Sequence, residues 1–377
     1  MRNMDNNRII PSITFVTLWG PNKQKTWSGI PWALLNEIKK QTRVKEIPLR
    51  IREFSFWDKV KIKLGIFDHD MDLGLVKQNR KWIKSQLTKE DNIVFQFGDF
   101  AFDTTSRKTY VYQDACVNYI MNLYKTDLTT FRYSNFSVNG IDAIKKREKY
   151  EADYYKNCSG IFTMSHWLKE YLISSCMIPE QRVHHVGGGI NVNYQLIDDS
   201  RKEGNKILFV GRDFIRKGGG IVCQAFKLLK TRMPNAELHI AGPTSNPLKE
   251  DINGTHYWGD CTPDKVGELM NLCDVFCMPS YFEAYGLVFV EALTYGLPCI
   301  GRNKYEMPYL IEHGKTGLLI NDDNIQLLAN NMYELLSNPL YRETVKSKRN
   351  EYIRNYSWET VTKKILSVIE KDIIISK

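Results

Sequence analysis

Long hydrophobic runs are missing from this sequence of 377 residues. No segment approaches the roughly 18 consecutive apolar residues that a transmembrane helix requires, so the sequence does not indicate a membrane-spanning protein. The first apolar run, from Ile9 to Trp19, is interrupted by Pro11 and by hydroxyl side chains. Because this run lacks a long apolar centre and a small-residue cleavage site, it favours an opening strand over a signal peptide.

Paired cysteine and histidine motifs are missing as well. None of the eight cysteines forms a C-x-x-C pair, and the closest two, Cys273 and Cys277, fall in or beside an apolar strand. We therefore expect free thiols in a reducing cytoplasm, without a disulfide framework or a zinc site. The seven histidines show no H-E-x-x-H spacing. His239 falls in an apolar strand, which favours a hydrogen-bonded core residue over a ligand.

Two common nucleotide-binding signatures are also absent. The segment 314–316 reads Gly-Lys-Thr like the end of a P-loop, but Tyr309 stands where that motif requires its first glycine. The glycine runs at 187–189 and 218–220 do not fit G-x-G-x-x-G, so the usual NAD fingerprint is missing. We predict no cofactor.

The overall composition is typical of a soluble globular protein. With 43% hydrophobic and 25% charged residues, the chain is long enough for two domains of roughly 150 residues or more each. Lysine and arginine total 52 against 43 acidic residues, which gives a net charge of +9 and favours acidic partners such as phosphates or anionic lipid. No nucleic-acid-binding module accompanies this charge, so we predict no nucleic-acid partner.

Strand-like and helix-like segments alternate along the chain, which predicts an α/β fold with parallel sheets. The first half opens with a strand at 12–18 and a helix at 28–40. The second half repeats this opening with a strand at 206–210, a glycine loop and a helix from about 220 to 230. Two such openings indicate two Rossmann-like halves. Further strands are predicted at 92–97, 109–112, 160–164, 237–241, 275–278 and 298–301, a linker at 198–205, and an amphipathic helix at 357–369.

The segment 274–301 carries most of the chemical information. A buried strand leads into a short loop with Glu283, and Gly286 then opens a helix that contains Glu291. Parallel sheets bind ligands at the carboxyl ends of their strands, and a helix N-terminus offers free N–H groups that suit phosphate. Two carboxylates beside a phosphate site would accept hydrogen bonds from hydroxyl groups. A nucleotide sugar is a ligand with this combination of groups.

A second cluster follows the strand at 206–210. That strand ends at Gly211, and the loop carries Arg212 and Lys217. Arginine can hold a diphosphate with two hydrogen bonds, whereas lysine acts as a point charge. Lys217 alone would be consistent with a solvated basic loop, but together with the carboxylates it favours phosphate binding.

Together the two clusters resemble the retaining glycosyltransferases of family four. That family has the GT-B fold, in which two Rossmann-like domains face a central cleft. Glu283 and Glu291 match its E-x7-E motif, and Arg212 and Lys217 match its diphosphate-binding pair. The resemblance implies that Glu291 binds the ribose hydroxyls and Glu283 the hydroxyls of the donor sugar. The other donor-binding residues that it implies are Gly29, Gly211, Gly259, Gly286 and Leu287.

The resemblance also implies a domain organisation. Residues 1–197 would form the acceptor-side domain, 198–356 the nucleotide-sugar donor domain, and 357–377 a helix that crosses back to the first domain. The family often carries His-Asp after a strand of the first domain, where this sequence has Gln113-Asp114. A glutamine cannot act as a base but can orient a hydroxyl. Asp114 is therefore either a fourth catalytic candidate beside Arg212, Lys217 and Glu283, or a cap of the helix that begins near Ala115.

The implied reaction moves a sugar from a nucleoside diphosphate sugar, by default a UDP-sugar, to an acceptor hydroxyl with retention of configuration. Its place would be the synthesis of a cell-surface glycan, glycolipid or glycoprotein. Cationic side chains and a helix N-terminus could stabilise the leaving diphosphate, so we expect no metal requirement. Two alternatives stay open: a non-catalytic nucleotide-sugar-binding partner of another transferase, and a GT-B epimerase, although the sequence offers no acid/base set for the latter.

The segment 39–64 suggests where the protein acts. It carries nine lysines and arginines against three acidic residues, interleaved with aromatic side chains. Either it contacts an anionic membrane surface, which makes the protein peripheral at the cytoplasmic face, or its aromatic residues pack inside the first domain. The basic residues are Lys39, Lys40, Arg43, Lys45, Arg50, Arg52, Lys59, Lys61 and Lys63, and the large apolar ones are Phe54, Phe56, Trp57, Ile62 and Leu64.

Overall fold

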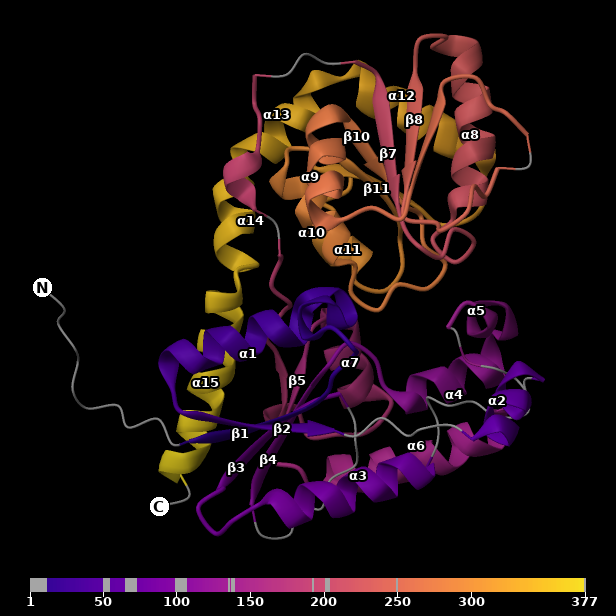
Figure 1. Cartoon of the computed structure of the whole chain (residues 1–377). Helices are drawn as coiled ribbons and strands as arrows, with labels where there is room; N and C mark the ends of the chain where they lie inside the picture. Colours follow the sequence, from indigo (N-terminus) through magenta and orange to yellow (C-terminus); the bar gives the residue numbers. More distant parts are fainter. Residues whose placement is uncertain are drawn as a thin grey trace, which may run out of the picture. The chain divides into compact units, whose positions relative to one another are not determined.

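A computed structural model describes residues 12–49, 55–64, 73–98, 107–134, 136, 140–191, 193–200, 204–248 and 250–375. The chain forms two compact units: unit 1 comprises Met1–Gly189 and Trp358–Lys377, and unit 2 comprises Ile190–Ser357 (Figure 1). The division therefore falls at Gly189 rather than at residue 197. Ile190 belongs to the hydrophobic core of unit 2, and its amide donates to the Tyr356 carbonyl at 2.9 Å.

Unit 1 is built on a parallel six-stranded sheet in the order β2-β1-β3-β4-β5-β6. Its strands are β1 (Ile13–Leu18), β2 (Val44–Leu49), β3 (Ile93–Phe97), β4 (Lys108–Gln113), β5 (Gly160–Thr163) and β6 (Val183–His185). The central strands are apolar on both faces because helices cover both sides of the sheet; every residue of β3 is buried. The first turn after β1 is the 3-10 segment η1 (Lys23–Gly29).

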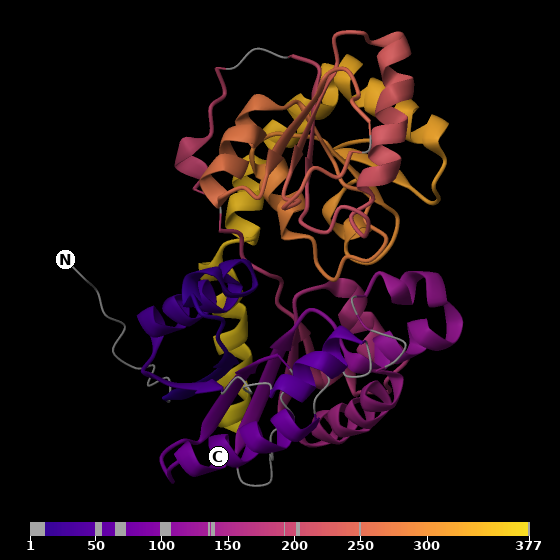
Figure 2. The same cartoon turned by 45° about the vertical axis from the view of Figure 1, so that its right-hand side comes forward.

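The helices of unit 1 include one from the far end of the chain. They are α1 (Ile30–Gln41), α2 (Phe56–Lys63), α3 (Leu73–Gln86), α4 (Val117–Thr126), α5 (Leu128–Arg132), α6 (Ile141–Asn157), α7 (His166–Ser174) and α15 (Trp358–Ile375). Helix α15 lies beside α1 in both views, which places the C-terminal helix within unit 1 (Figures 1 and 2). The amphipathic pattern predicted this helix, although it runs beyond the predicted end at residue 369.

Unit 2 repeats the architecture with strand order β12-β11-β10-β7-β8-β9. The strands are β7 (Lys206–Val210), β8 (Glu237–Ala241), β9 (Thr255–Gly259), β10 (Val275–Cys277), β11 (Cys299–Arg302) and β12 (Gly317–Ile320). Its helices are α8 (Gly219–Arg232), α9 (Pro263–Leu272), α10 (Leu287–Thr294), α11 (Met307–Leu310), α12 (Ile325–Ser337), α13 (Pro339–Ser347) and α14 (Arg349–Asn355). Strand β7 pairs with β10 on one side and β8 on the other, so the ends of all three strands meet at one edge.

The predicted α/β fold with parallel sheets is confirmed. Strands β7 and β8 have the predicted bounds, whereas β2, β6, β9 and β12 were not predicted. Strand β2 contains Lys45, Glu46 and Pro48, and β9 alternates partly exposed side chains; both are edge strands, which need no continuous apolar run. All eight cysteines carry free thiols. Among the described helices, none is both long enough and apolar enough to cross a membrane.

Candidate active site

Lys217 and Glu283 meet at the carboxyl edge of the sheet in unit 2. Lys217 lies in the loop between β7 and α8, and Glu283 in the loop between β10 and α10; the two side chains form an ion pair and are only 13% and 11% exposed. Ser280 Oγ also donates to the Glu283 carboxylate at 3.2 Å. Burial lowers the pKa of Lys217, and the Glu283 carboxylate opposes that shift. The two predicted clusters therefore form one site.

Arg216, which the sequence did not single out, joins the same two loops. Its Nη1 donates to the Phe282 carbonyl at 2.8 Å, and its Nε donates to Asp213 at 3.2 Å. Its own carbonyl accepts from the Tyr281 amide at 2.9 Å. These bonds fix the backbone on both sides of the ion pair. The only sequence signal was a second cation directly before Lys217.

Arg302 supports the loop from the neighbouring strand. It ends β11, is 5% exposed, and donates through Nη2 to Asp323 at 2.6 Å and to the Pro279 carbonyl at 3.5 Å. Its guanidinium also lies 4.5 Å from the centre of the Tyr281 ring. Arg302 thereby holds the start of the loop that carries Glu283. Nothing in the strand's apolar pattern distinguished this arginine, because its partner is distant in sequence.

Close backbone approach explains the glycines at this edge. A Cβ on Gly211 would lie 2.8 Å from Lys217 Cγ, and one on Gly242 would lie 2.6 Å from the Gly211 carbonyl carbon. Gly218 has a φ of +79°, and a Cβ there would lie 2.6 Å from the Pro279 carbonyl oxygen. Side chains at these positions would push the β7 loop away from its neighbours. The glycines therefore preserve the geometry that brings Lys217 to Glu283.

Arg212 turns toward a different strand end. Its Nε lies 3.2 Å from Asp260 Oδ1, and its side chain is 79% exposed. Asp260 follows β9, whose last residue, Gly259, accepts the Gly242 amide at 2.7 Å. The two predicted cations therefore have different partners. Lys217 is held in the loop by Glu283, whereas Arg212 is solvent-accessible beside Gly259.

Helix α10 presents its N-terminus next to Glu283. Gly286 caps the helix with a φ of +90°, and a Cβ there would lie 3.3 Å from Glu283 Cγ. The helix begins at Leu287, so its first amides open toward the Glu283 loop. Glu291 lies one turn further along, where burial raises the pKa of its carboxyl to about 7 and the Asn191 amide acts in the opposite direction. Unit 2 therefore combines a helix N-terminus, two cations and two carboxyl groups.

The candidates in unit 1 lie at the carboxyl edge of its own sheet. Gly29 has a φ of +80° and caps α1, whose start at Ile30 is two residues later than predicted. Gln113 ends β4, is 4% exposed, and donates from Nε2 to the Tyr155 hydroxyl. This bond makes Gln113 part of the interior. Asp114, directly after it, is exposed.

The first amides of the helix that Asp114 was expected to cap have a different acceptor. Helix α4 begins at Val117, later than expected, and its first amides donate to Glu151: Val117 at 2.9 Å and Asn118 at 3.3 Å. Glu151 is 2% exposed and also accepts from the Tyr155 hydroxyl at 2.9 Å. A buried carboxylate from α6 therefore replaces the predicted local cap. Its position 34 residues after Val117 left no recognisable local pattern.

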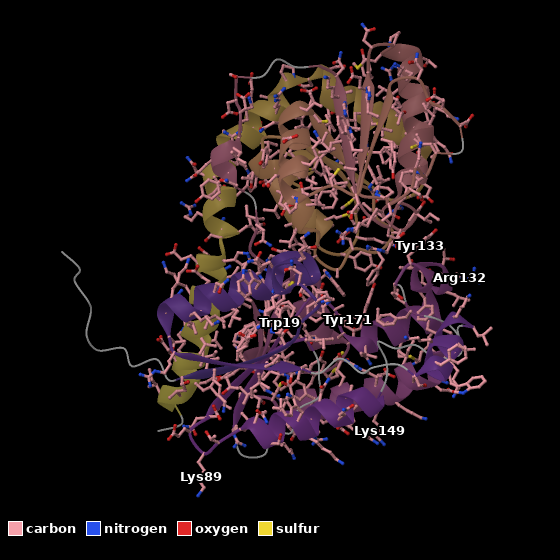
Figure 3. All side chains as sticks on the ribbon, viewed as in Figure 1. Trp19, Lys89, Arg132, Tyr133, Lys149 and Tyr171 are labelled. Atoms are coloured by element: carbon pink, nitrogen blue, oxygen red, sulfur yellow. The ribbon has the colours of Figure 1, made fainter. Side chains whose placement is uncertain are left out.

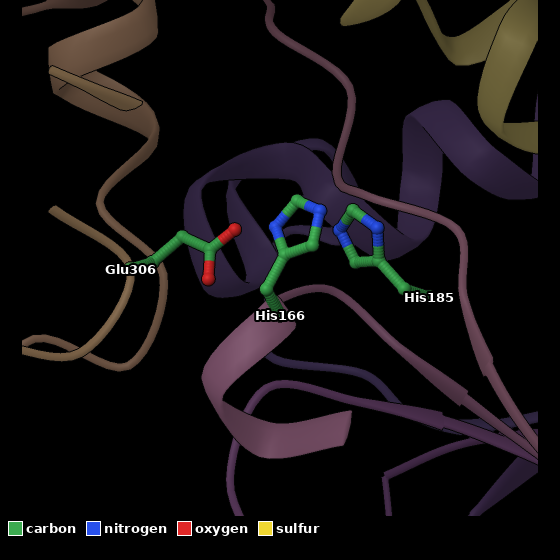
Figure 4. Close-up of side chains that lie close together, drawn as sticks. All are labelled: His166, His185 and Glu306. Carbon is green, nitrogen blue, oxygen red and sulfur yellow. The ribbon is translucent and has the colours of Figure 1, made fainter. Parts of the chain in front are cut away.

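Two histidines that the sequence did not pair also lie at this edge. His166 begins α7 after β5, His185 ends β6, and their rings lie 3.6 Å apart between centroids (Figure 4). His185 Nε2 lies 3.2 Å from the Met164 carbonyl. Burial, reinforced by the neighbouring His166, lowers the pKa of His185 to about 3. His185 is therefore neutral at physiological pH, and its ring packs against that of His166.

A histidine cluster in unit 2 lies away from the carboxyl edge. Glu237, His239 and His256 place one ligand atom each within 4.8 Å of the others. However, Trp258 Nε1 donates to His239 Nδ1 at 3.2 Å, so neutral His239 carries its proton on Nε2, which lies 3.1 Å from Glu237. This tautomer offers no lone pair to a cation. His239 is 3% exposed and is a hydrogen-bonded core residue, as the sequence predicted.

Comparison with known proteins shows what this architecture is similar to. Residues 196–370 match the family described as "Glycosyl transferases group 1". A sucrose-phosphate synthase structure from Thermosynechococcus elongatus superimposes with a TM-score of 0.68 at 14% identity, over 97% of this chain and 100% of the other. A glycosyltransferase structure involved in lipopolysaccharide biosynthesis gives 0.65 at 15% identity, over 95% and 99%. The fold is GT-B.

Among curated proteins, a phosphatidyl-myo-inositol mannosyltransferase from Mycolicibacterium smegmatis is 28% identical over 46% of this chain and 47% of its own length. The chain thus spans about half the length of the curated relatives it matches. The matched residues 196–370 include the Lys217–Glu283 site. Residues 196–370 are therefore similar to the group 1 glycosyltransferases, and the chain as a whole has the GT-B fold.

Proposed function

We propose that this protein transfers a sugar from a nucleoside diphosphate sugar, with UDP as the default nucleotide, to an acceptor hydroxyl with retained configuration. The observation that carries the proposal is the Lys217–Glu283 pair beside the N-terminus of α10. Unit 2 would bind the donor, and unit 1 with α15 would bind the acceptor. The family match over residues 196–370 supports the donor assignment, because it covers this site.

Each group has a defined task in this proposal. The first amides of α10, near Gly286 and Leu287, and the cations Lys217 and Arg212 bind the diphosphate and stabilise the charge that develops as the glycosidic bond breaks. Electrostatic donors of this kind contribute roughly 3–4 kcal/mol each at a transition state. Glu283 accepts from the hydroxyls of the donor sugar, and Glu291 from the ribose. The glycine backbone at 211 and 259 leaves room for the nucleotide.

The anomeric configuration is retained if the acceptor hydroxyl attacks the donor sugar from the same face that the diphosphate leaves. The leaving phosphate oxygen then accepts the proton of the acceptor hydroxyl, so no protein base is required. This route agrees with the engagement of Gln113 by Tyr155, which removes it from proton transfer. Exposed Asp114 remains the acceptor-side candidate for orienting a hydroxyl. Because the cations neutralise the leaving group, we propose that the reaction needs no metal.

The buried position of Gln113 also supports the second candidate, a non-catalytic nucleotide-sugar-binding partner of another transferase. A thermal-shift screen of nucleotide sugars, followed by a hydrolysis assay with the donor that stabilises the protein, separates the two. Slow donor hydrolysis without acceptor, and glycosyl transfer detected by mass spectrometry with acceptor mixtures, would support the enzyme. Tight donor binding without either reaction would support the partner.

Helix α2 supports a peripheral membrane location at the cytoplasmic face. Phe56, Trp57 and Leu64 are 73%, 69% and 62% exposed, so these residues do not pack inside unit 1. Lys59, Lys61 and Lys63 are exposed on the same short segment. Such a mixture suits anionic lipid, with roughly 1 kcal/mol for each cation near the surface. Similarity to a mannosyltransferase of phosphatidyl-myo-inositol supports a lipid-linked acceptor over a free glycan or a protein.

The rest of the basic segment contributes less than its composition suggested. Lys45 is bound by Asp91 at 2.6 Å, Lys40 by Glu37 at 2.6 Å, and Lys39 lies 3.8 Å from Glu46. Arg50, Arg52 and Phe54 fall outside the described residues, as does the side chain of Ile62. The lipid-binding surface that we propose is therefore helix α2 with Leu64.

A further inference from the structure

Trp27 is held in a backbone conformation that tryptophan rarely adopts. Its φ and ψ are 42° and 57°, and Ser28 and Gly29 continue in the left-handed region with φ of 57° and 80°. Each non-glycine residue in this region costs on the order of 1–3 kcal/mol and persists only when surrounding contacts impose it. Trp27 and Ser28, two such residues in succession, lie in the connection between β1 and α1. The surrounding contacts therefore hold this loop in a shape that its own residues disfavour.

Hydrogen bonds brace this loop from both sides. Asn22 accepts the Gln24 amide on its side chain at 2.9 Å and the Thr26 hydroxyl on its carbonyl at 3.0 Å. Thr26 Oγ1 in turn accepts the Gly20 amide at 3.0 Å. Thr26 is 8% exposed, so the brace lies beneath the loop, whereas Trp27 stays at the surface with 46% of its area exposed. The loop therefore presents Trp27 from a rigid base.

One face of the indole is supported and the remainder is open. Trp27 stacks on Phe97, the last residue of β3, with ring centroids 5.2 Å apart and planes 23° from parallel. Phe97 packs edge-on against Tyr112 at 5.5 Å, and the Tyr112 hydroxyl donates to the Gly187 carbonyl at 2.8 Å. Phe97 and Tyr112 are buried. The rings of Trp27, Phe97 and Tyr112 thus pack against one another at the carboxyl ends of β3 and β4. This is the edge at which parallel sheets bind ligands.

We propose that Trp27 is a stacking platform for a pyranose ring of the acceptor, an inference that rests on the proposed function. An exposed, rigid aromatic plane binds the C–H face of a sugar and leaves the hydroxyls to polar neighbours. Polar side chains alone would bind hydroxyls but would not distinguish a ring from an open-chain polyol. Trp27 therefore acts as a specificity residue for cyclic acceptors.

The test uses intrinsic fluorescence of the full chain titrated with methyl glycosides of glucose, galactose, mannose and N-acetylglucosamine. We expect at least one glycoside to change the emission of the wild-type protein and glycerol to leave it unchanged. Trp27→Phe should abolish the signal while calorimetry shows a Kd within about twofold of wild type. Trp27→Ala and Trp27→Leu should raise that Kd about two- to tenfold. Trp82→Phe, which alters a partly exposed tryptophan on α3, is the control and should change neither the fluorescence response nor the Kd.

Three results would overturn the inference: no response to any glycoside, an unchanged Kd in both Trp27→Ala and Trp27→Leu, or a Trp27-dependent response to uridine alone, which would make the platform a base-stacking site. Melting temperatures of the variants show whether the loop stays folded. UDP binding, measured on the same samples, tests the proposed function separately. Loss of the glycoside effect with UDP binding intact refutes only the platform, whereas glycoside binding without any nucleotide binding refutes the proposed function.

Discussion

The Lys217 ammonium and the Glu283 carboxylate, 66 residues apart in the sequence, form a buried ion pair where the β7 and β10 loops meet. Any substrate that binds at this pair must compete with the contact between the two side chains. A diphosphate competes with Glu283 for the lysine, and a sugar hydroxyl competes with Lys217 for the carboxylate. Binding of a ligand with both groups replaces one internal contact by two external ones, so neither charge is left unpaired.

The first prediction concerns the separate contributions of this ion pair to the free energy of unfolding and to catalysis. Lys217→Met and Glu283→Gln should each lower the free energy of unfolding by about 3–5 kcal/mol, because each leaves an uncompensated buried group. The double variant should recover most of that loss, since no charge remains. All three should lose about a hundredfold or more in kcat/KM. Urea unfolding and donor hydrolysis measure the two effects; strictly additive stability losses would show that the charges do not interact.

The second prediction concerns Arg212. Arg212→Ala should lower kcat/KM about a hundredfold through loss of a diphosphate contact, while the melting temperature stays unchanged. Its ion pair with Asp260 is exposed, and such pairs contribute at most about 1 kcal/mol to stability. Arg132→Ala is the control, since that arginine is also exposed and lies on α5 (Figure 3). Full activity in Arg212→Ala would remove Arg212 from the site.

The third prediction follows from the raised pKa of Glu291, about 7 in the folded chain against 4.5 for an ordinary glutamate. Between these values the folded state holds a proton that the unfolded state has lost, so the stability contribution of Glu291 decreases as pH rises. The total change is about 3 kcal/mol. Glu291→Gln should therefore be more stable than wild type at pH 8 and similar at pH 4.5, by urea unfolding at both values. If the free energies of unfolding of the two proteins changed equally between pH 4.5 and pH 8, the prediction would be wrong.

The same residue gives a binding prediction. Glu291→Ala should mainly weaken donor binding, and a donor without ribose hydroxyls should bind the variant and the wild type with nearly equal affinity. The reason is that the carboxylate and the hydroxyls form one interaction, which either change removes. Calorimetry gives the Kd of each donor for the wild type and for the variant, and these four values show whether the two changes remove the same interaction. If the two losses simply add, Glu291 does not contact the ribose.

The fifth prediction concerns metal. EDTA should leave turnover unchanged, because Lys217, Arg212 and the N-terminus of α10 supply the positive charge that the leaving diphosphate requires. Turnover is measured after dialysis against EDTA and again after addition of Mg²⁺ or Mn²⁺. A reversible loss on chelation would instead assign the charge neutralisation to a metal.

Membrane binding can be tested on the same protein. Vesicles containing anionic lipid should cosediment with it at low salt and release it as salt rises, whereas neutral vesicles should not bind. Changing Lys59, Lys61 and Lys63 to glutamate should abolish binding without changing donor affinity. Lys89→Glu with Lys149→Glu is the control, because both lysines point into solvent outside α2 (Figure 3). Equal binding to both vesicle types would exclude the electrostatic surface.

The sequence by itself determined the α/β class, the repeated strand–loop–helix openings and the residues of the candidate site in unit 2. Those features are local: apolar runs, glycines at positive φ such as Gly286, and charged side chains directly after strands. Parallel topology then predicts that strand-end residues meet at one edge, which is why Lys217 and Glu283 could be assigned together although they are far apart in the chain.

Only the tertiary structure decided which partners those residues have. Arg216, Arg302 and Glu151 act through bonds to distant backbone groups, and such bonds leave no periodic pattern in the sequence. The same holds for the exposure of Phe56 and Trp57, since composition does not distinguish a buried aromatic residue from an exposed one. Local chemistry determined which residues are candidates, and long-range packing determined their partners and their accessibility.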